Sequence, residues 1–160
     1  AGRLVFALRD GDARHVVLLA RTTGPGERGD LLYRTEAGTW SAAAADAAPL
    51  FRAGPGGVSV SENAYLGGGL AGYAWPVPGV NGEPPRLRVF ARSARAPEGP
   101  WSAETVLFDT RGAPSSAAVP VAREHPHLAR EGGRVLRVTV DPGGGEGLPR
   151  MWRVDLPEVR

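Results

Sequence analysis

Short stretches of alternating apolar and polar residues, each ended by glycine or proline, limit the folds open to this chain more than any other feature. Within residues 57–110, four such stretches follow one another, at 58–62, 70–77, 86–93 and 104–108. A period of two residues is that of a β-strand with one face in a core, and Gly/Pro clusters mark the turns between strands. This part of the sequence predicts a four-stranded antiparallel meander.

Similar stretches occur on both sides of this meander. They cover residues 4–8, 15–21, 30–35 and 49–51 before it, and 124–129, 134–140 and 150–156 after it. A turn is expected at 38–41. The alanine-rich segment 42–48 has helix propensity but no apolar period, so we expect a loop or one helical turn there. The predicted regular structure is β-strand throughout, and the expected fold class is all-β.

The predicted strands repeat along the chain with a period of about 60 residues. The motif GTWSAA at 38–43 corresponds to GPWSAE at 99–104, and an apolar–aromatic pair recurs at Leu32-Tyr33, Val89-Phe90 and Met151-Trp152. Units of four strands at this period are typical of β-propellers, in which neighbouring blades bury each other's faces. We therefore expect a single partial propeller with four-stranded blades at about 3–51, 57–110 and 124–157. Because a ring needs at least four blades, we interpret the chain as a fragment.

Four stretches carry a resemblance to a known family: SVSENAYLGGGLAGYAW, ARSARAPEGPWSAETVLFD, EHPHLAREGGRVLRVTV and MWRVDLP. They resemble the C-terminal blades of a bacterial family of uncharacterised, glycosidase-like five-bladed β-propellers, related in fold to arabinanase-like and sialidase-like propellers. The resemblance covers residues 57–160 and, more weakly, the first repeat. It implies a five-bladed ring completed by the remaining blades of a parent chain. It also implies an exported protein, which is secreted, periplasmic or lipoprotein-anchored, and a role in carbohydrate chemistry.

Two glutamates are the candidate catalytic residues for such a role. Glycoside hydrolysis uses two carboxylates, about 5 Å apart in retaining enzymes and about 6.5–9.5 Å apart in inverting ones. Glu62 and Glu124 stand in matching inner-strand contexts, where propeller sites lie. The alternative is that Glu62 and Asn63 cap a turn, since asparagine readily bonds its own backbone there. Whether the protein is an enzyme stays open.

The candidate substrate-binding residues are Asn63, Tyr65, Trp75, His125 and His127. Trp75, with Tyr73 and Tyr65, could offer aromatic faces to a sugar ring, although large aromatics also pack between blades. His125 and His127 would share one face of a strand, but a metal site needs three or four ligands. We expect structural histidines here, and neither a metal nor a cofactor.

Composition excludes several kinds of chemistry. The chain has no cysteine and no lysine, which excludes thiol nucleophiles, disulfides and Schiff bases. Its net charge is only +2 and its arginines are scattered rather than gathered in a stripe, so nucleic acid is not an expected partner. No apolar run approaches the roughly 20 residues of a membrane span.

Three functional hypotheses follow from the sequence. The first is an exported propeller that binds or hydrolyses carbohydrate. The second is a non-catalytic propeller that serves as a scaffold for protein–protein interaction. A convergent acidic pair would favour the first. The third, a β-sandwich carbohydrate-binding module, fits the length but does not explain the repeat.

Overall fold

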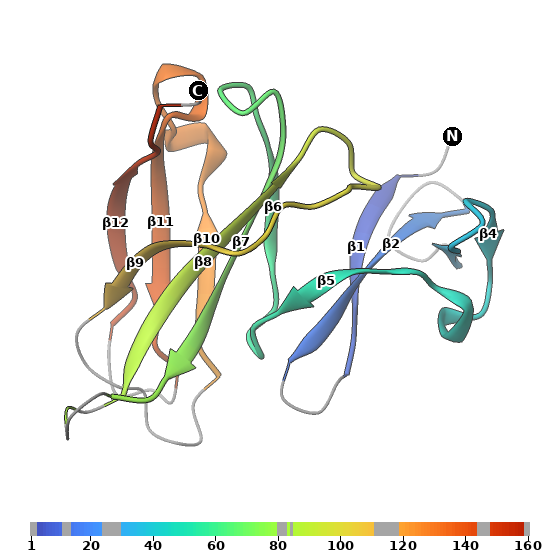
Figure 1. The fold of residues 1–160 in the computed structure, drawn as a ribbon, viewed down its shortest axis with the longest axis horizontal. Helices are drawn as coiled ribbons and strands as arrows, with labels where there is room; N and C mark the ends of the chain where they lie inside the picture. Colours follow the sequence, from blue (N-terminus) through green and yellow to red (C-terminus); the bar gives the residue numbers. More distant parts are fainter. Residues whose placement is uncertain are drawn as a thin grey trace. The chain divides into compact units, whose positions relative to one another are not determined.

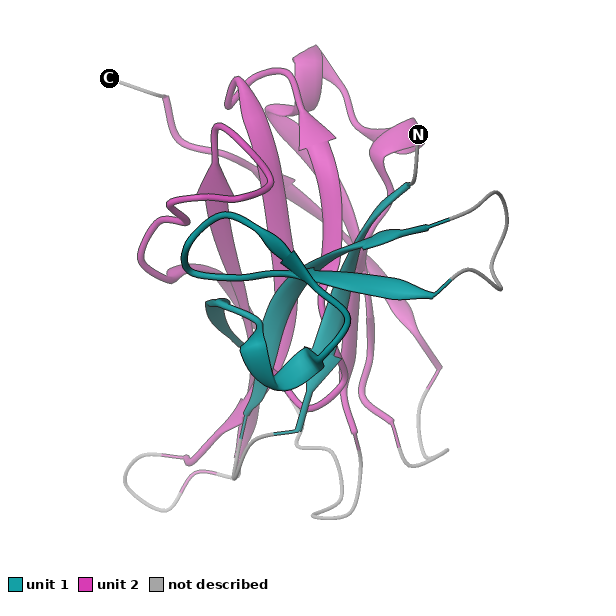
Figure 2. Ribbon diagram, turned by 90° about the vertical axis from the view of Figure 1, so that its right-hand side faces the viewer, with its two compact units in different colours: residues 1–52 teal, residues 53–160 magenta. Residues whose placement is uncertain are grey.

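The computed structural model describes residues 3–10, 14–23, 30–79, 83, 85–110, 119–143 and 148–158. These residues form twelve strands in antiparallel sheets, and the helical segments are three single 3₁₀ turns (Figure 1). The chain divides into two compact units, residues 1–52 and residues 53–160, which Figure 2 distinguishes by colour. The all-β fold class is confirmed.

The first unit is a sheet built around β2 (His15–Thr22). β1 (Leu4–Arg9) pairs with β2 along its length, from Leu4 opposite Arg21 to Arg9 opposite Val16. β3 (Leu31–Arg34) and β4 (Trp40–Ser41) follow, and then a 3₁₀ turn, η1 (Ala44–Asp46). The side chains of 17–20 are at most 1% exposed, so both faces of β2 are covered, as its continuous apolar run requires.

The first unit departs from the predicted meander in one respect. β5 (Pro49–Ala53) pairs with β2 and not with β4. The reason is strand length: β3 pairs only with residues 20–22 of β2, which leaves the rest of that edge open to β5. The predicted turn at 38–41 also contains a short strand, since Tyr33 pairs with Ser41 and Arg34 with Trp40.

The second unit begins with the predicted four-stranded meander, which is confirmed. It consists of β6 (Ser59–Asn63), β7 (Gly68–Val77), β8 (Arg86–Ala94) and β9 (Thr105–Thr110), in that order across the sheet. Alternation buries Leu87, Val89 and Ala91 on one face of β8. The register between β8 and β9 shifts after Val89, so that Phe90 lies opposite Val106.

The third sheet contains three strands among the described residues, one fewer than the expected blade. They are β10 (Val121–Glu124), β11 (Val135–Asp141) and β12 (Arg150–Asp155). The prediction of a strand or extended segment at 124–129 was wrong, because β10 ends at Glu124. Residues 126–128 form a 3₁₀ turn, η2 (Pro126–Leu128), and Pro126, which has no N–H to donate, occupies its first position. A second turn, η3 (Glu131–Gly133), leads into β11.

The second and third sheets share one hydrophobic core. Its buried members are Leu70, Ala74, Leu87, Val89 and Ala91 from one sheet and Ala122, Leu136, Val138, Val140, Val154 and Leu156 from the other. Phe108 of β9 and Trp152 of β12 stack beside it, with ring centroids 5.1 Å apart. Each apolar side chain buried here contributes about 1.5–3 kcal/mol, so the two sheets stabilise one another.

Candidate functional site

The buried carboxylate of Glu124 lies between the second and third sheets. Glu124 is only 8% exposed, and its side chain accepts a hydrogen bond from the Ser61 hydroxyl. Its backbone N–H donates to the Ser59 hydroxyl oxygen at 3.2 Å. Ser59 and Ser61 are two residues apart on β6 and therefore face β10 together. The Ser61 hydroxyl supplies a hydrogen bond to the buried carboxylate, and Ser59 satisfies the backbone N–H of the same residue.

The structure does not bring Glu62 and Glu124 together. Glu62 is exposed, and it follows Ser61 directly on β6. Because successive side chains on a strand point to opposite faces, Glu62 points away from the face that carries Ser61 and Glu124. The predicted pair is thus one buried and one solvated carboxylate on opposite sides of a strand.

Burial raises the pKa of Glu124 above its usual value of 4.5, and the hydrogen bond from Ser61 and the charge of His125 oppose this shift in part. Between pH 4.5 and the raised pKa of the folded state, the folded protein therefore holds a proton that the unfolded chain has lost. Stability should fall as pH rises through that range.

We expect Glu124→Gln to remove this decline in stability, because the amide carries no charge at any pH. Urea unfolding midpoints measured from about pH 4 to pH 7 test this. Ser61→Ala should make the decline steeper, because it removes a bond to the charged form. Equal pH slopes in wild type and Glu124→Gln would contradict the assignment.

Asn63 has a structural position, as the capping interpretation predicted. It is 3% exposed, its amide Nδ2 donates to the Gly133 carbonyl at 2.9 Å, and its Oδ1 accepts from the Leu66 N–H at 3.0 Å. Tyr65, in the same turn, donates its N–H to Gly132 O at 2.7 Å. This turn is therefore tied to η3 through its side chains and its backbone.

The three aromatic residues proposed as a sugar platform are not gathered on one surface. The Tyr65 hydroxyl donates to the Pro157 carbonyl at 3.2 Å, while Trp75 lies near the far end of β7. Tyr73 is fully buried and stacks on Phe90 at 5.8 Å. An exposed ring face is what a sugar would need, and Tyr73 offers none.

The Tyr73 hydroxyl belongs to a partly buried polar network. It donates to the Glu104 carboxylate at 2.7 Å and accepts from Arg92 Nε at 3.1 Å. Burial and the bond to Glu104 raise the pKa of Tyr73 to about 12, against the lowering effect of Arg92. The network joins β7, β8 and the segment that leads into β9.

His125 and His127 lie side by side, although not on a strand. Their ring centroids are 5.8 Å apart and the planes are nearly perpendicular, at 89°. His125 Nε2 shares a hydrogen bond of 2.7 Å with the Thr139 hydroxyl, and His127 is exposed in η2. Among the described residues, no group of three His, Asp or Glu side chains could hold a metal ion.

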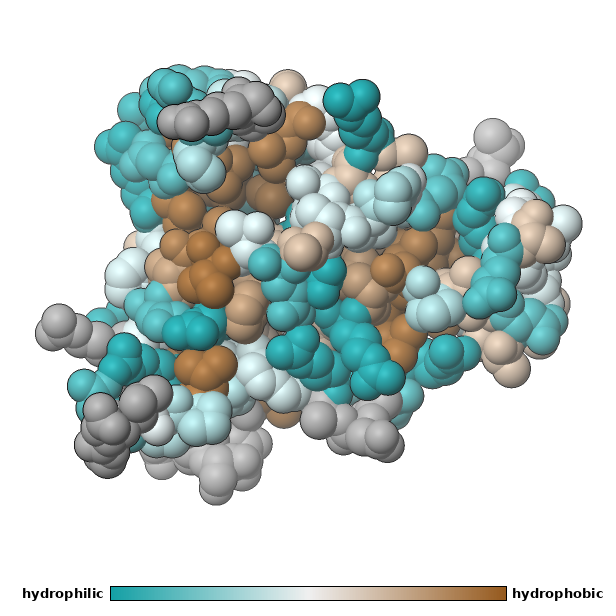
Figure 3. All heavy atoms as spheres, viewed as in Figure 1, coloured by the Kyte–Doolittle hydropathy of each residue, from teal (hydrophilic) through white to brown (hydrophobic). Residues whose placement is uncertain are grey.

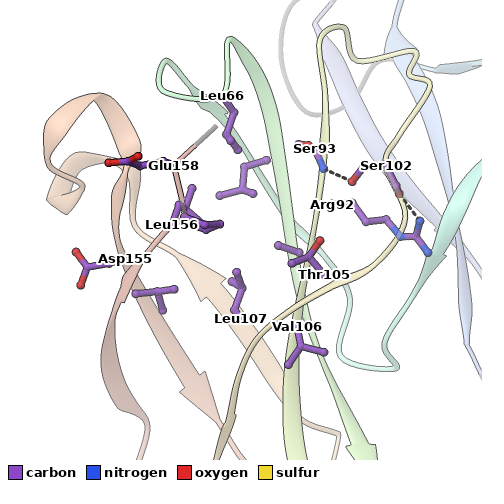
Figure 4. A pocket seen from close by; sticks show the side chains of 14 residues that line it. Leu66, Arg92, Ser93, Ser102, Thr105, Val106, Leu107, Asp155, Leu156 and Glu158 are labelled. Atoms are coloured by element: carbon purple, nitrogen blue, oxygen red, sulfur yellow. Dashed lines mark hydrogen bonds between the residues drawn. The ribbon is translucent and has the colours of Figure 1, made fainter. Parts of the chain in front are cut away.

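A pocket that the sequence did not predict lies in the second unit, between β9 and the end of β12 (Figure 4). Its volume is about 290 Å³. Its apolar lining comes from Leu66, Leu70, Ala91, Val106, Leu107, Val154, Leu156 and Pro157, and its polar rim from Arg92, Ser93, Ser102, Thr105, Asp155 and Glu158. Apolar side chains reach the surface of this unit in the left half of Figure 3.

The register shift in β9 shapes this pocket. Phe108 pairs with Val89 and Val106 with Phe90, which leaves Leu107 as the extra residue of a β-bulge. A bulge turns its side chains out of strict alternation, so Val106 and Leu107 both reach the pocket. On the polar rim, Arg92 Nη1 donates to the Ser102 carbonyl at 2.5 Å, and Arg92 Nη2 forms an ion pair with Glu104 Oε1 at 3.4 Å.

Comparisons with protein-family models, with curated proteins and with solved structures found no match to this chain. In the part of the chain that the structure describes, no helix has the length and apolar character needed to cross a membrane.

Proposed function

We propose that this chain is part of a β-propeller that serves as a non-catalytic scaffold for protein–protein interaction. The four-stranded meander β6–β9 supports the propeller part of the proposal, as does the hydrophobic core that this meander shares with the third sheet. The repeat of about 60 residues supports it independently. The rest of the ring would belong to the parent chain.

The observation that carries the non-catalytic part is the placement of the two glutamates. Both classes of glycosidase need two carboxylates that face one substrate. Glu124 is buried and accepts a hydrogen bond from Ser61, and Glu62 points to the other face of β6. Neither arrangement offers a sugar an acid and a base together.

The pocket between β9 and β12 favours a protein as the binding partner. Apolar side chains line it and polar groups form its rim, which suits an apolar side chain of a partner. No aromatic ring is among the described residues that line it. Sugar sites use such rings as stacking faces.

Carbohydrate binding by an exported protein is the second candidate. The adjacent rings of His125 and His127 favour it, because imidazole nitrogens can exchange hydrogen bonds with sugar hydroxyls. Export itself rests on the family resemblance described above.

A screen of chromogenic glycosides together with a glycan array separates these candidates. We expect no turnover by wild type, Glu62→Gln or Glu124→Gln, with Glu98→Gln in an exposed turn as the control. Turnover that Glu62→Gln abolishes and Glu98→Gln retains would overturn the proposal. Glycan binding without turnover that is lost in His127→Ala would favour the second candidate.

Selection of displayed peptides tests the scaffold directly. Peptides with large apolar side chains should bind wild type and lose binding to Val106→Arg, because that side chain lines the pocket and is already 48% exposed. Arg123→Asp, on the exposed face of β10, serves as the control. Equal binding to wild type and Val106→Arg would remove the pocket from the proposal.

A further inference from the structure

The outer edge of β12 lies open among the described residues. In the second sheet β9 pairs with the outer edge of β8, whereas the third sheet ends at β12. An open edge presents backbone N–H and C=O groups that can pair with another strand. The length and charge pattern of β12 define the strand that would fit.

The direction of the β12 backbone groups follows from one hydrogen bond. The Leu156 N–H donates to the Arg134 carbonyl at 2.8 Å. Because antiparallel strands alternate the direction of these groups, Val154 and Trp152 also turn theirs toward β11. The backbone groups of Arg153 and Asp155 therefore point away from β11, at the open edge.

The side chains of Arg153 and Asp155 lie on one exposed face of β12. They form an ion pair with 3.0 Å between Arg153 Nη2 and Asp155 Oδ1. The intervening Val154 is 8% exposed and faces the second sheet. The edge thus has charged groups on its outer face and apolar groups on its inner face.

The sequence of β12 is complementary to itself in the antiparallel direction. If Val154 lies opposite Val154 of a second copy, Arg153 lies opposite Asp155 and Arg150 opposite Glu158. On the inner face Trp152 lies opposite Leu156. Opposite charges and apolar pairs in these positions stabilise strand pairing. A pairing centred on Arg153 would instead place two arginines opposite each other.

We propose that β12 pairs with β12 of a second copy of this chain, antiparallel and centred on Val154. Arg153 of each copy and Asp155 of the other copy then exchange both backbone N–H···O bonds, one such pair lying on either side of Val154. The ladder ends at Pro157, which lacks an N–H and whose carbonyl accepts from Tyr65. The second copy takes the place beside β12 that β9 takes beside β8.

This pairing also brings the second copy next to the pocket described above. Leu156 lines the pocket, and Trp152 of the second copy lies beside Leu156 on the inner face of the extended sheet. The proposal goes beyond the scaffold function and does not depend on it, because self-association is measured without any other partner.

Sedimentation of charge variants provides the main test. Wild type should sediment at twice its mass of 16.8 kDa as concentration rises, and Arg153→Asp or Asp155→Arg alone should remain monomeric. An equimolar mixture of the two variants should recover the dimer, since each then meets opposite charge at both positions. Arg123→Asp should behave as wild type.

A mixture that stays monomeric, or variants that sediment as wild type does, would overturn the proposal. So would a wild type that is monomeric at every concentration, which is the result expected if another strand already covers the edge.

Disulfide formation tests the register. The chain has no native cysteine. The two Val154 residues at the centre would form a non-hydrogen-bonded antiparallel pair, in which the Cα atoms are about 4.5 Å apart. Val154→Cys should therefore form a covalent dimer on oxidation. Met151→Cys places the two thiols about 20 Å apart and should not. Efficient crosslinking of Met151→Cys, or equal crosslinking of both, would contradict this register.

Discussion

Gly133→Ala is expected to lower the free energy of unfolding of the second unit by about 2–5 kcal/mol. The residue has φ +100°, a left-handed conformation that costs an L side chain about 1–2 kcal/mol. A Cβ there would lie 2.5 Å from Asn63 Nδ2 and 2.8 Å from Asn63 Oδ1. Displacing this buried amide adds about 1–3 kcal/mol for each group left unpaired. Urea unfolding followed by tryptophan fluorescence measures the change.

Gly67→Ala provides a matched control for the backbone contribution. Gly67 has φ +67°, and no described atom lies within 4 Å of the Cβ that alanine would add. This variant should lose only the conformational cost of about 1–2 kcal/mol. If both variants lost the same stability, the contact between η3 and Asn63 would contribute nothing.

Leu136→Ala is expected to lower the free energy of unfolding by about 2–5 kcal/mol. Leu136 is fully buried on β11, within the core shared by the second and third sheets. Truncation removes apolar contacts and leaves a cavity that close-packed neighbours fill only in part. Thermal and urea unfolding of the same preparation measure the loss.

Leu128→Ala is the companion variant for this experiment. Leu128 is 41% exposed in η2, so its truncation should change stability by less than about 0.5 kcal/mol. A cost for Leu136→Ala as small as that for Leu128→Ala would mean that the two sheets do not share a core.

The strands of the second sheet could be predicted from sequence because their pattern is local. β8 alternates apolar and polar residues, and the turns around β7 carry glycine and proline, so neighbouring residues determine where each strand lies. The capping position of Asn63 could also be predicted from the sequence, because its hydrogen bond to the Leu66 N–H spans only three residues.

Features that depend on distant residues could not be predicted. β5 joins β2 because β3 pairs with only three residues of that edge. Two glutamates in similar contexts lie on opposite faces because a one-residue shift reverses a side chain. The pocket depends on the bulge at Leu107, which alternation in sequence does not reveal.

The polar contacts that join β6 to the third sheet have a kinetic consequence. Ser61 bonds Glu124 across 63 residues of sequence, Ser59 accepts from Glu124 across 65, and Asn63 donates to Gly133 across 70. Such contacts form only after the ends of a long loop have come together. This loop closure costs conformational entropy before the hydrogen bonds can offset it. The second unit should therefore fold slowly for its size, with the meander β6–β9 formed before the third sheet docks on it.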